Sequence, residues 1–573
     1  MLVAVVATAL MLMLAACTSG DELKQAAPLQ SAQTAKPTLV SEATPAAAQA
    51  EEVSIERGGV LSYATHAAFS SFDLHWESGY VATQPLTPIY NGLLMRDVTT
   101  AGDDPIGQLT PDLAEKWEAL DGGNTYVFNL RQDVTWNDGS EFSCEDVDST
   151  FTKWLNSDVS TRGTTFPTMG SFRCTDASTF EVNFDVPQGS FLTAVGSARF
   201  EIHKKEITDQ VEMFRQGITK EPDFLVGTGP YMFKSWTNGL EFVAQRRTDY
   251  WKIGEDGDPL PYLDGYKAVV MKDLSAIFGA FRAKQLTMGG IARHLEKNDA
   301  EIIERDGLDV TILVGPRNAF HNIRFNLEKP PTNDIRVRQA IWLAIDQRAT
   351  IQAAVQGWGS MGTFIAPHLP FGIPEEEMLA HEYFSTDMES RRAKARELLA
   401  DAGFPDGLEL ILEQRQGPLY DLGTIANQAD LKKVGINVEI RLRDTPTAFG
   451  LSASGDFNLL TLPGSPLLDD PDGYWSFFQS WQSPRINGTR YKSEEFDRLY
   501  AQQSSEIDLV RRIEITREID RLLLRDLPSH RSYYWFQSMA YWNNLQGFHM
   551  NFGDNVYNFG KWEKVWCKAG QCQ

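Results

Sequence analysis

The sequence predicts an α/β fold, because stretches with strand periodicity and stretches with helical periodicity follow one another along most of the 573 residues. The second observation is composition. Hydrophobic residues make up 42% of the chain and aromatic residues 11%, which is enough to build large buried cores. The length corresponds to roughly three or four domain-sized units. Together these features predict a large globular protein that combines strands and helices.

The segment Asn322–Asp346 shows both periodicities within one short stretch. Apolar residues first alternate as in a half-buried strand, at Ile323, Phe325 and Leu327. The adjoining prolines 330 and 331 cannot donate to a β ladder, so the strand should end there. Asn333 or Asp334 can then cap a helix whose apolar residues recur at helical spacing: Ile335, Val337, Ile341, Ala344 and Ile345.

Other elements are expected on both sides of this segment. On its N-terminal side we expect, in order, a strand at Gly58–Ala64, a short amphipathic helix at Leu109–Trp117, a strand at Tyr126–Leu130, an Asp-Gly turn at Trp136–Ser140 and a helix at Glu145–Leu155. On its C-terminal side we expect the helix to extend over 335–355, another helix to start near Tyr474, and one long amphipathic helical region at Tyr491–Pro528.

The charge of the chain restricts its partners. The formal net charge of −24 argues against a nucleic-acid binder or a general binder of anionic membranes, both of which need a basic surface. We therefore expect no nucleic-acid partner. The acidic turn Glu255–Asp258 is interpreted as solvated surface.

The first residues indicate export. Met1–Ala16 is apolar, too short to span a bilayer comfortably, and ends in Leu14-Ala15-Ala16-Cys17. This ending resembles a bacterial lipobox, in which cleavage precedes a cysteine that becomes lipidated. We expect residues 1–16 to be a lipoprotein signal peptide and Cys17 to carry the lipid anchor; the alternative is an ordinary signal peptide with a chance cysteine. No Lys or Arg precedes the apolar run, which a start codon further upstream would explain.

Residues 17–52 are poor in large apolar residues and are expected to form a disordered tether.

The other four cysteines predict two disulfides in an oxidising compartment. Cys144 and Cys174 lie in one region, and Cys567 and Cys572 bracket a short C-terminal loop. A metal site is the alternative, but no C-x-x-C spacing is present.

Motifs for catalysis and cofactors give little support to an enzyme. The sequence Gly357-Trp358-Gly359-Ser360-Met361-Gly362 satisfies G-x-G-x-x-G, but it follows a predicted helix instead of a strand and is interpreted as a glycine loop. Neither G-x-S-x-G, nor Walker A, nor H-E-x-x-H occurs. We expect no cofactor, no metal site and no catalytic residues, with a secreted hydrolase as a distant alternative.

Several blocks, in one order, resemble the family 5 solute-binding proteins, the peptide, nickel and opine receptors of bacterial ABC importers. In the segment described first, these are F-N-x-x-x-P-P and D-x-R-V-R-Q-A-I-x-x-A-I-D. The others are Y-N-G-L-L at Tyr90–Leu94, L-x-P-D-L-A-x-x-W at Leu109–Trp117, Y-x-F-x-L-R-x-x-V-x-W-x-D-G at Tyr126–Gly139, D-V-x-x-T-F at Asp146–Phe151, G-T-G-P-Y at Gly227–Tyr231, and Asp249–Trp251 followed by Pro261–Gly265. The matching blocks run from about Gly58 to Trp562.

The resemblance implies a two-lobed fold like that of type II periplasmic binding proteins of the large cluster C type. Mixed sheets, a two-strand hinge and an extra subdomain inserted in lobe I are then expected. Mapped onto this chain, lobe I comprises 53–84, 224–312 and 536–573, the inserted subdomain comprises 85–223, and lobe II comprises 313–535. These names are used below for these residue ranges.

The resemblance also implies that the ligand binds in the cleft between the lobes. It implies that the block Asp469-Asp470-Pro471-Asp472-Gly473-Tyr474-Trp475 lies on the lobe II wall. In peptide-binding members an acid just before this block holds the ligand's α-amine, but that position falls here on Leu467. Asp469 could take its place only if the loop is shifted. Helix capping by these carboxylates is the alternative. The residues expected to bind ligand are Trp76, Asn318, Phe320, His321, Trp358, Asp469, Asp470, Tyr474 and Trp475.

The predicted function is an extracytoplasmic solute-binding receptor of an ABC importer. We expect it to capture a peptide-like solute and deliver it to the permease's transmembrane subunits, as a monomer held by lipid in the periplasm or on the outer face of the cell membrane. An oligosaccharide, an opine, a metal chelate or another organic cation is the alternative cargo, because aromatic side chains also stack on sugars and attract cations.

Overall fold

The computed structural model describes residues 54–69, 71–77, 79–97, 108–210, 222–289, 295–466, 468–484, 486–550 and 561–572. The predictions for the signal peptide, Cys17, the tether and Leu467 fall outside these residues. Contacts between Cα atoms place Val53–Gln573 in one compact unit. None of the described helices combines the length and the apolar character that crossing a bilayer requires.

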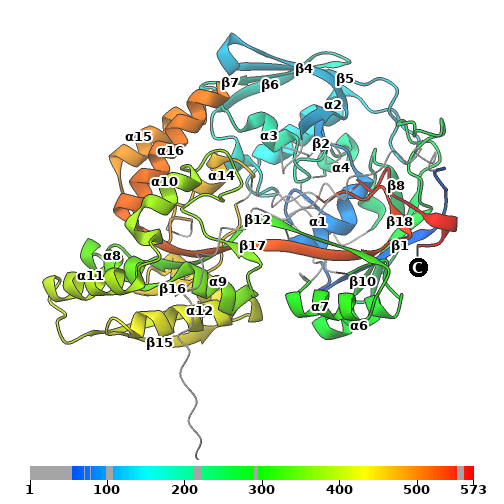
Figure 1. The fold of residues 1–573 in the computed structure, drawn as a ribbon. Coiled ribbons are helices and arrows are strands. Elements are labelled where there is room, and N and C mark those ends of the chain that lie inside the picture. The colour runs from blue at the N-terminus through cyan, green and yellow to red at the C-terminus, as the bar shows by residue number, and fades with distance from the viewer. Residues whose placement is uncertain are drawn as a thin grey trace, which may run out of the picture. The chain divides into compact units, whose positions relative to one another are not determined.

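A mixed sheet of eleven strands forms the centre of this unit (Figure 1). Its strands follow the order β15-β14-β16-β12-β17-β11-β1-β10-β9-β8, and β13 pairs with β17. The bounds are β1 Val60–Thr65, β8 Tyr231–Thr237, β9 Glu241–Arg246, β10 Gly265–Val270, β11 Met288–Gly289, β12 Val310–Phe325, β13 Gly359–Ser360, β14 Leu408–Arg415, β15 Ile436–Arg443, β16 Leu459–Thr461 and β17 Ser529–Trp542.

The two longest strands, β12 and β17, pair antiparallel along most of their length, from Val310↔Trp542 to Arg324↔Ser529. On the β12 side of this pair the sheet continues with β16 and β14, and on the β17 side it continues with β11, β1 and β10. Figure 1 shows the pair running between two groups of helices. The predicted lobe boundaries at 313 and 536 fall within these two strands.

The residues of lobe II form the largest hydrophobic core. Its buried members all lie between Phe320 and Tyr534. The helices around this half of the sheet are α8 Ile335–Ala344, α9 Gln347–Val355, α10 Glu375–Ala380, α11 Met388–Asp401, α12 Pro418–Lys432, α13 Thr445–Ser454, α14 Pro471–Trp475, α15 Glu494–Ser505 and α16 Leu509–Asp526.

The inserted subdomain has a sheet of its own. Its four antiparallel strands are β4 Ala114–Leu120, β5 Thr125–Leu130, β6 Met169–Asp176 and β7 Thr179–Phe184, in the order β4-β5-β7-β6. The smaller elements nearby are α1 Tyr80–Leu86, β2 Leu94–Asp97, β3 Gln108–Pro111, α2 Cys144–Leu155, α3 Phe191–Val195 and α4 Lys205–Thr208. The core of this part also contains Leu468, which comes from the loop after β16.

The remaining elements belong to lobe I. These are α6 Leu274–Arg282 and α7 Lys297–Arg305, which pack against residues of β1, β12 and β17, and the short pair β18 Leu545–Gln546 and β19 Trp566–Cys567. Both predicted disulfides are present, between Cys144 and Cys174 and between Cys567 and Cys572. The predicted strands at Gly58–Ala64 and Tyr126–Leu130 are confirmed as β1 and β5, and the helix at Glu145–Leu155 as α2.

Three expectations about local structure are corrected. The helix expected at Leu109–Trp117 is wrong: β3 pairs with β2 and β4 with β5, so that tertiary pairing prevails over helical spacing. The helix expected over 335–355 is divided, because Asp346 caps a new helix, α9, with its carboxylate. The region Tyr491–Pro528 is likewise divided into α15 and α16, with Asp508 capping α16.

Candidate functional site

The candidate site lies where β12 meets the loop that follows β16. Phe320 of β12 exchanges two backbone hydrogen bonds with Gly464, from Phe320 N to Gly464 O (2.9 Å) and from Gly464 N to Phe320 O (3.1 Å). A Cβ atom at position 464 would collide with the Phe320 ring, so glycine permits this close approach. The loop is thereby fixed to the strand just before the predicted acidic block.

Asn318 and Asp469 form the polar centre of this junction. Asn318 donates from Nδ2 to Asp469 Oδ1, and both side chains are buried. The Tyr474 hydroxyl donates to the Asn318 carbonyl oxygen (3.4 Å). The structure therefore brings three predicted site residues together, and an amide–carboxylate hydrogen bond orients the acid.

Asp470 has a structural role of its own. It is the N-cap of α14 and accepts from Asp472 N (3.0 Å). It also accepts two hydrogen bonds from Arg512 of α16, at 2.8 and 2.6 Å. The capping alternative considered for this block therefore holds for Asp470, because both of its oxygens are engaged by the protein.

The predicted aromatic residues differ in their surroundings. Phe320, Tyr474 and Trp475 are all buried in the lobe II core. Trp358 packs against a lobe I cluster that includes Phe281 and Trp542, close to the β12–β17 pair. Trp76 is 52% exposed, in a different part of the fold.

His321 points away from Phe320, as alternation along a strand requires. Its ring stacks on Tyr533 at 5.2 Å, and its Nε2 lies 3.2 Å from Thr424 Oγ1. Burial lowers the pKa of His321 to about 4, so the imidazole is neutral at pH 7. The structure thus separates His321 from the Asn318–Asp469 junction.

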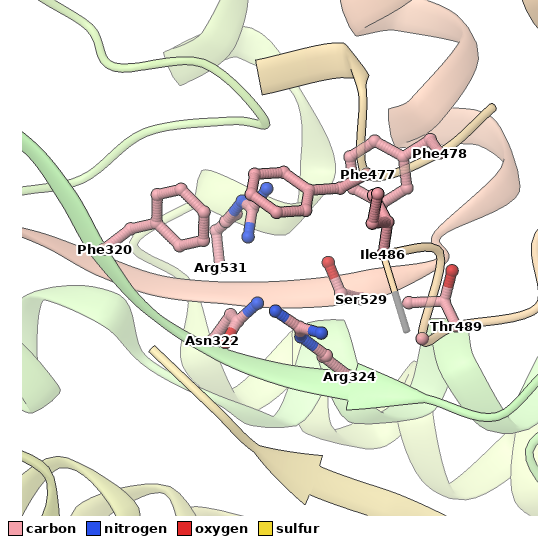
Figure 2. A pocket seen from close by; sticks show the side chains of 10 residues that line it. Phe320, Asn322, Arg324, Phe477, Phe478, Ile486, Thr489, Ser529 and Arg531 are labelled. Carbon is pink, nitrogen blue, oxygen red and sulfur yellow. The ribbon is translucent and has the colours of Figure 1, made fainter. Parts of the chain in front are cut away.

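The alternation of apolar residues in β12 predicts one solvated face, and this expectation is wrong. Every residue from Asn318 to Asn326 is buried, because helices and loops cover both faces of the strand. The face that carries Asn318 and Phe320 continues with Asn322 and Arg324. Arg531 of β17 lies beside them, with its Cζ 3.6 Å from the centroid of the Phe320 ring (Figure 2). The sequence analysis did not predict either arginine as a site residue. A charged residue within an otherwise apolar strand is nevertheless a signal of a special environment, because arginine is rarely buried without a partner.

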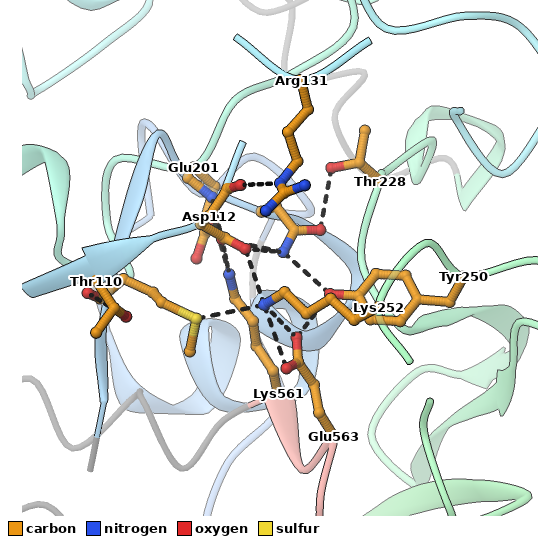
Figure 3. Close-up of polar contacts among 12 residues, drawn as sticks. Thr110, Asp112, Arg131, Glu201, Thr228, Tyr250, Lys252, Lys561 and Glu563 are labelled. Carbon is orange, nitrogen blue, oxygen red and sulfur yellow. Dashed lines mark hydrogen bonds and ion pairs between the residues drawn. The ribbon is translucent and has the colours of Figure 1, made fainter. Parts of the chain in front are cut away.

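A second group that sequence reasoning missed joins three distant segments (Figure 3). Asp112 of the inserted subdomain pairs with Lys252 (2.9 Å) and with Lys561 (2.7 Å), and Lys252 also pairs with Glu563 (3.0 Å). Burial alone would raise the pKa of Asp112, but the two lysines lower it to about 2. This network fixes the C-terminal segment against the inserted subdomain.

The inserted subdomain also contacts lobe II directly. Gly189 N donates to Ser504 O (2.7 Å), and Ser190 Oγ donates to Asp472 Oδ2 (2.6 Å). Leu468 lies in the core of the inserted subdomain, next to Asp469 in the chain. The acidic block therefore stands between β12 on one side and the inserted subdomain on the other.

Comparison with known proteins agrees with this architecture. The family model "Bacterial extracellular solute-binding proteins, family 5 Middle" matches residues 108–484. The probable deoxycholate-binding periplasmic protein YgiS of Escherichia coli (strain K12) is 25% identical over 497 residues, which cover 83% of this chain and 88% of the relative. The oligopeptide-binding protein AppA of Bacillus subtilis (strain 168) is 24% identical over 474 residues, or 78% of this chain and 82% of the relative.

Solved structures share the fold. The periplasmic binding protein DppA from Helicobacter pylori, in complex with the peptide STSA, has a TM-score of 0.73 at 22% identity and covers 89% of this chain and 98% of its own. AgaA from A. tumefaciens, in complex with agropinic acid, has a TM-score of 0.72 at 23% identity, with coverage of 89% and 99%. The predicted fold, that of type II periplasmic binding proteins, is thus confirmed. The chain belongs to family 5 of the bacterial extracellular solute-binding proteins.

Proposed function

We propose that this protein is the extracytoplasmic receptor of an ABC importer and captures a peptide-like solute between its lobes. Membership of a solute-binding family supports the receptor role. Peptide cargo is supported by relatives named as oligopeptide-, dipeptide- and di/tripeptide-binding proteins, and by related structures that hold peptides. As a receptor it binds and releases its cargo without chemical change.

The observation that carries the proposal is the position of Asp469. Its carboxylate is held by Asn318 of β12, on the lobe II side of the contact with the inserted subdomain. Its neighbour Leu468 is buried in the core of that subdomain. If the two parts separated, Leu468 would leave that core and Asp469 would be uncovered. An uncovered carboxylate can then receive the ammonium group of a peptide.

Closure is proposed to occur by bending of the β12–β17 pair, since these strands join the two halves of the large sheet. A bound solute favours the closed form only if it contacts both lobes there. The hydrogen bonds of Gly189 and Ser190 to lobe II then stabilise the closed state further. The closed receptor docks on the transmembrane subunits of the permease, and lipid on Cys17 keeps it near them as a monomer.

The test is the affinity of the full chain for the peptide Ser-Thr-Ser-Ala, measured by calorimetry for the wild type and for Asp469→Asn. The substitution keeps the shape of the side chain but removes its charge. Loss of a charge-assisted hydrogen bond predicts a tenfold or greater rise in Kd, from about 1.5–3 kcal/mol.

The matched control is Asp456→Asn, an exposed lobe II acid that pairs with Lys329 and should leave the affinity unchanged. Equal peptide affinities for the wild type and Asp469→Asn would contradict recognition of the amine at Asp469. A wild type that bound neither this peptide nor a pool of di- to nonapeptides would contradict peptide cargo.

A further inference from the structure

A small cavity of about 10 Å³ lies on the Asn322 face of the β12–β17 pair (Figure 2). Phenylalanines 477 and 478 and the loop near Thr489 enclose it on the opposite side. Its size corresponds to a single water-sized group. Two guanidinium groups border the cavity, those of Arg324 from β12 and Arg531 from β17.

Neither guanidinium group lies within 4 Å of a carboxylate oxygen among the described residues. Arg324 makes one side-chain hydrogen bond there, from Nη1 to Ser452 Oγ (3.2 Å). Arg531 Nη1 donates to Asn322 Oδ1 (3.0 Å) when the Asn322 amide donates to Leu462 O (2.7 Å). Burial, together with the nearby charge of Arg531, lowers the pKa of Arg324 to about 10. Burial also lowers the pKa of Arg531, and the hydroxyl of Tyr534, which is hydrogen-bonded to the Arg531 side chain, opposes that shift.

Other buried arginines of lobe II are compensated differently. Arg512 pairs with Asp470, while Arg338 and Arg391 each donate three hydrogen bonds to backbone carbonyl oxygens. Asp520 is the acid whose charge acts on Arg531, but its oxygens accept from Thr363, Phe364 and Ile373. Two buried cations without an ion-pair partner carry a large desolvation cost.

The polar atoms beside the cavity are mostly donors. Ser529 Oγ and Arg531 Nε are buried, and no hydrogen-bond partner is found for either among the described residues. The Asn322 oxygen is engaged by Arg531, and Thr489 Oγ1 donates to Asn487 Oδ1 (2.9 Å). We propose that Arg324, Arg531 and Ser529 form a binding site for a compact monovalent anion, either chloride or the carboxylate group of a solute.

The size of the cavity restricts the anion. A chloride ion or one carboxylate oxygen is on the scale of the available space, whereas phosphate and sulfate are much larger. Positive charge on two sides and a hydroxyl donor supply the recognition, since hydrogen bonds to charged groups are the strong ones. Chloride binding at this site can be measured without any peptide, so the failure of this proposal and the failure of the proposed function are distinguishable.

The test is the ³⁵Cl NMR linewidth of chloride solutions that contain the full chain. The proposal predicts an excess linewidth that saturates with chloride, falls when bromide is added, and disappears on thermal unfolding. The melting temperature should also rise with chloride concentration relative to gluconate at the same ionic strength, because a ligand of the folded state stabilises it. Arg324→Met and Arg531→Met should each abolish both effects.

The matched control is Arg525→Met, which removes the same charge from an exposed side chain of lobe II and should retain both effects. Circular dichroism reports whether each variant is folded, and the wild-type titrations test the proposal without any variant. Formate and Ser-Thr-Ser-Ala distinguish the sources of the anion. Displacement of chloride by the peptide assigns the site to a solute carboxylate, and displacement by formate alone assigns it to a resident ion. A wild-type linewidth and melting temperature that do not respond to chloride or formate would overturn the proposal.

Discussion

Glu201 connects burial to the pH dependence of stability. Burial raises the pKa of its carboxyl to about 7 from an ordinary value of 4.5, although Lys561 lies 4.0 Å away. A carboxyl group with a raised pKa binds its proton more tightly in the folded state. Its contribution to stability is therefore fully present below pH 4.5 and is lost as the pH rises to 7.

Replacement of Glu201 by Gln should remove this dependence. Between pH 4.5 and 7, we expect the wild type to lose about 3 kcal/mol more unfolding free energy than Glu201→Gln. Asp520, whose pKa burial raises to about 6, contributes equally to both proteins and cancels in the difference. Urea unfolding at several pH values measures the effect.

The control for this prediction is Glu206→Gln, since the Glu206 side chain is 71% exposed. Its stability should follow the wild-type curve. Parallel curves for the wild type and Glu201→Gln would mean that Glu201 is ionised in the folded protein, with Lys561 outweighing its burial.

Some residues of the candidate site could be predicted from the sequence, and others could not. Asn318 and Asp469 were both expected at the cleft, and the structure joins them by a hydrogen bond. Arg324 and Arg531 were not expected, because alternation along a strand shows which residues share a face but not what covers that face. The same limit applies to Glu201, whose burial depends on segments far away in the chain.

At the scale of elements, the Asp470–Arg512 ion pair joins α14 to α16. Both side chains are almost fully buried. Arg512→Met leaves the charge of Asp470 buried without its partner, and we expect a loss of about 3–5 kcal/mol of stability. Asp470→Asn with Arg512→Met should recover part of this loss, because Asn still caps a helix and carries no charge.

Chemical denaturation of the two single variants and the double variant completes a thermodynamic cycle for this pair. The control is Arg521→Met, which breaks an exposed pair with Glu377 and should cost less than about 1 kcal/mol. A double variant as unstable as the sum of its single variants would argue against coupling between α14 and α16.

Helices could be predicted from the sequence where a capping residue or a capping box marks their first turn. The helix at Ile335 begins after the Asp334 cap, and α2 begins after a Ser143–Asp146 capping box. The breaks before α9 and α16 carry local signals of the same kind, the capping aspartates Asp346 and Asp508. Strands β3 and β4 could not be found in this way, because their partners β2 and β5 decide their structure.

At the scale of the whole molecule, the contact between the inserted subdomain and lobe II should help to hold the closed form. Ser190 Oγ donates to Asp472, which also accepts from Gln503 and Ser504. Ser190→Ala removes one hydrogen bond to a carboxylate and leaves the polypeptide path unchanged. A loss of about 1.5–3 kcal/mol from the closed state should shift the population toward the open form.

Small-angle scattering of the full chain tests the central claim, capture of a solute by closure of two lobes. We predict that molecules of the wild type that are open without ligand close when Ser-Thr-Ser-Ala is saturating, which lowers the average radius of gyration of the sample. Ser190→Ala should start from a larger radius and need more peptide to reach the same compact value, while the exposed control Ser505→Ala should match the wild type. If calorimetry shows peptide binding but the radius of Ser190→Ala equals that of the wild type with and without peptide, closure between the lobes is contradicted.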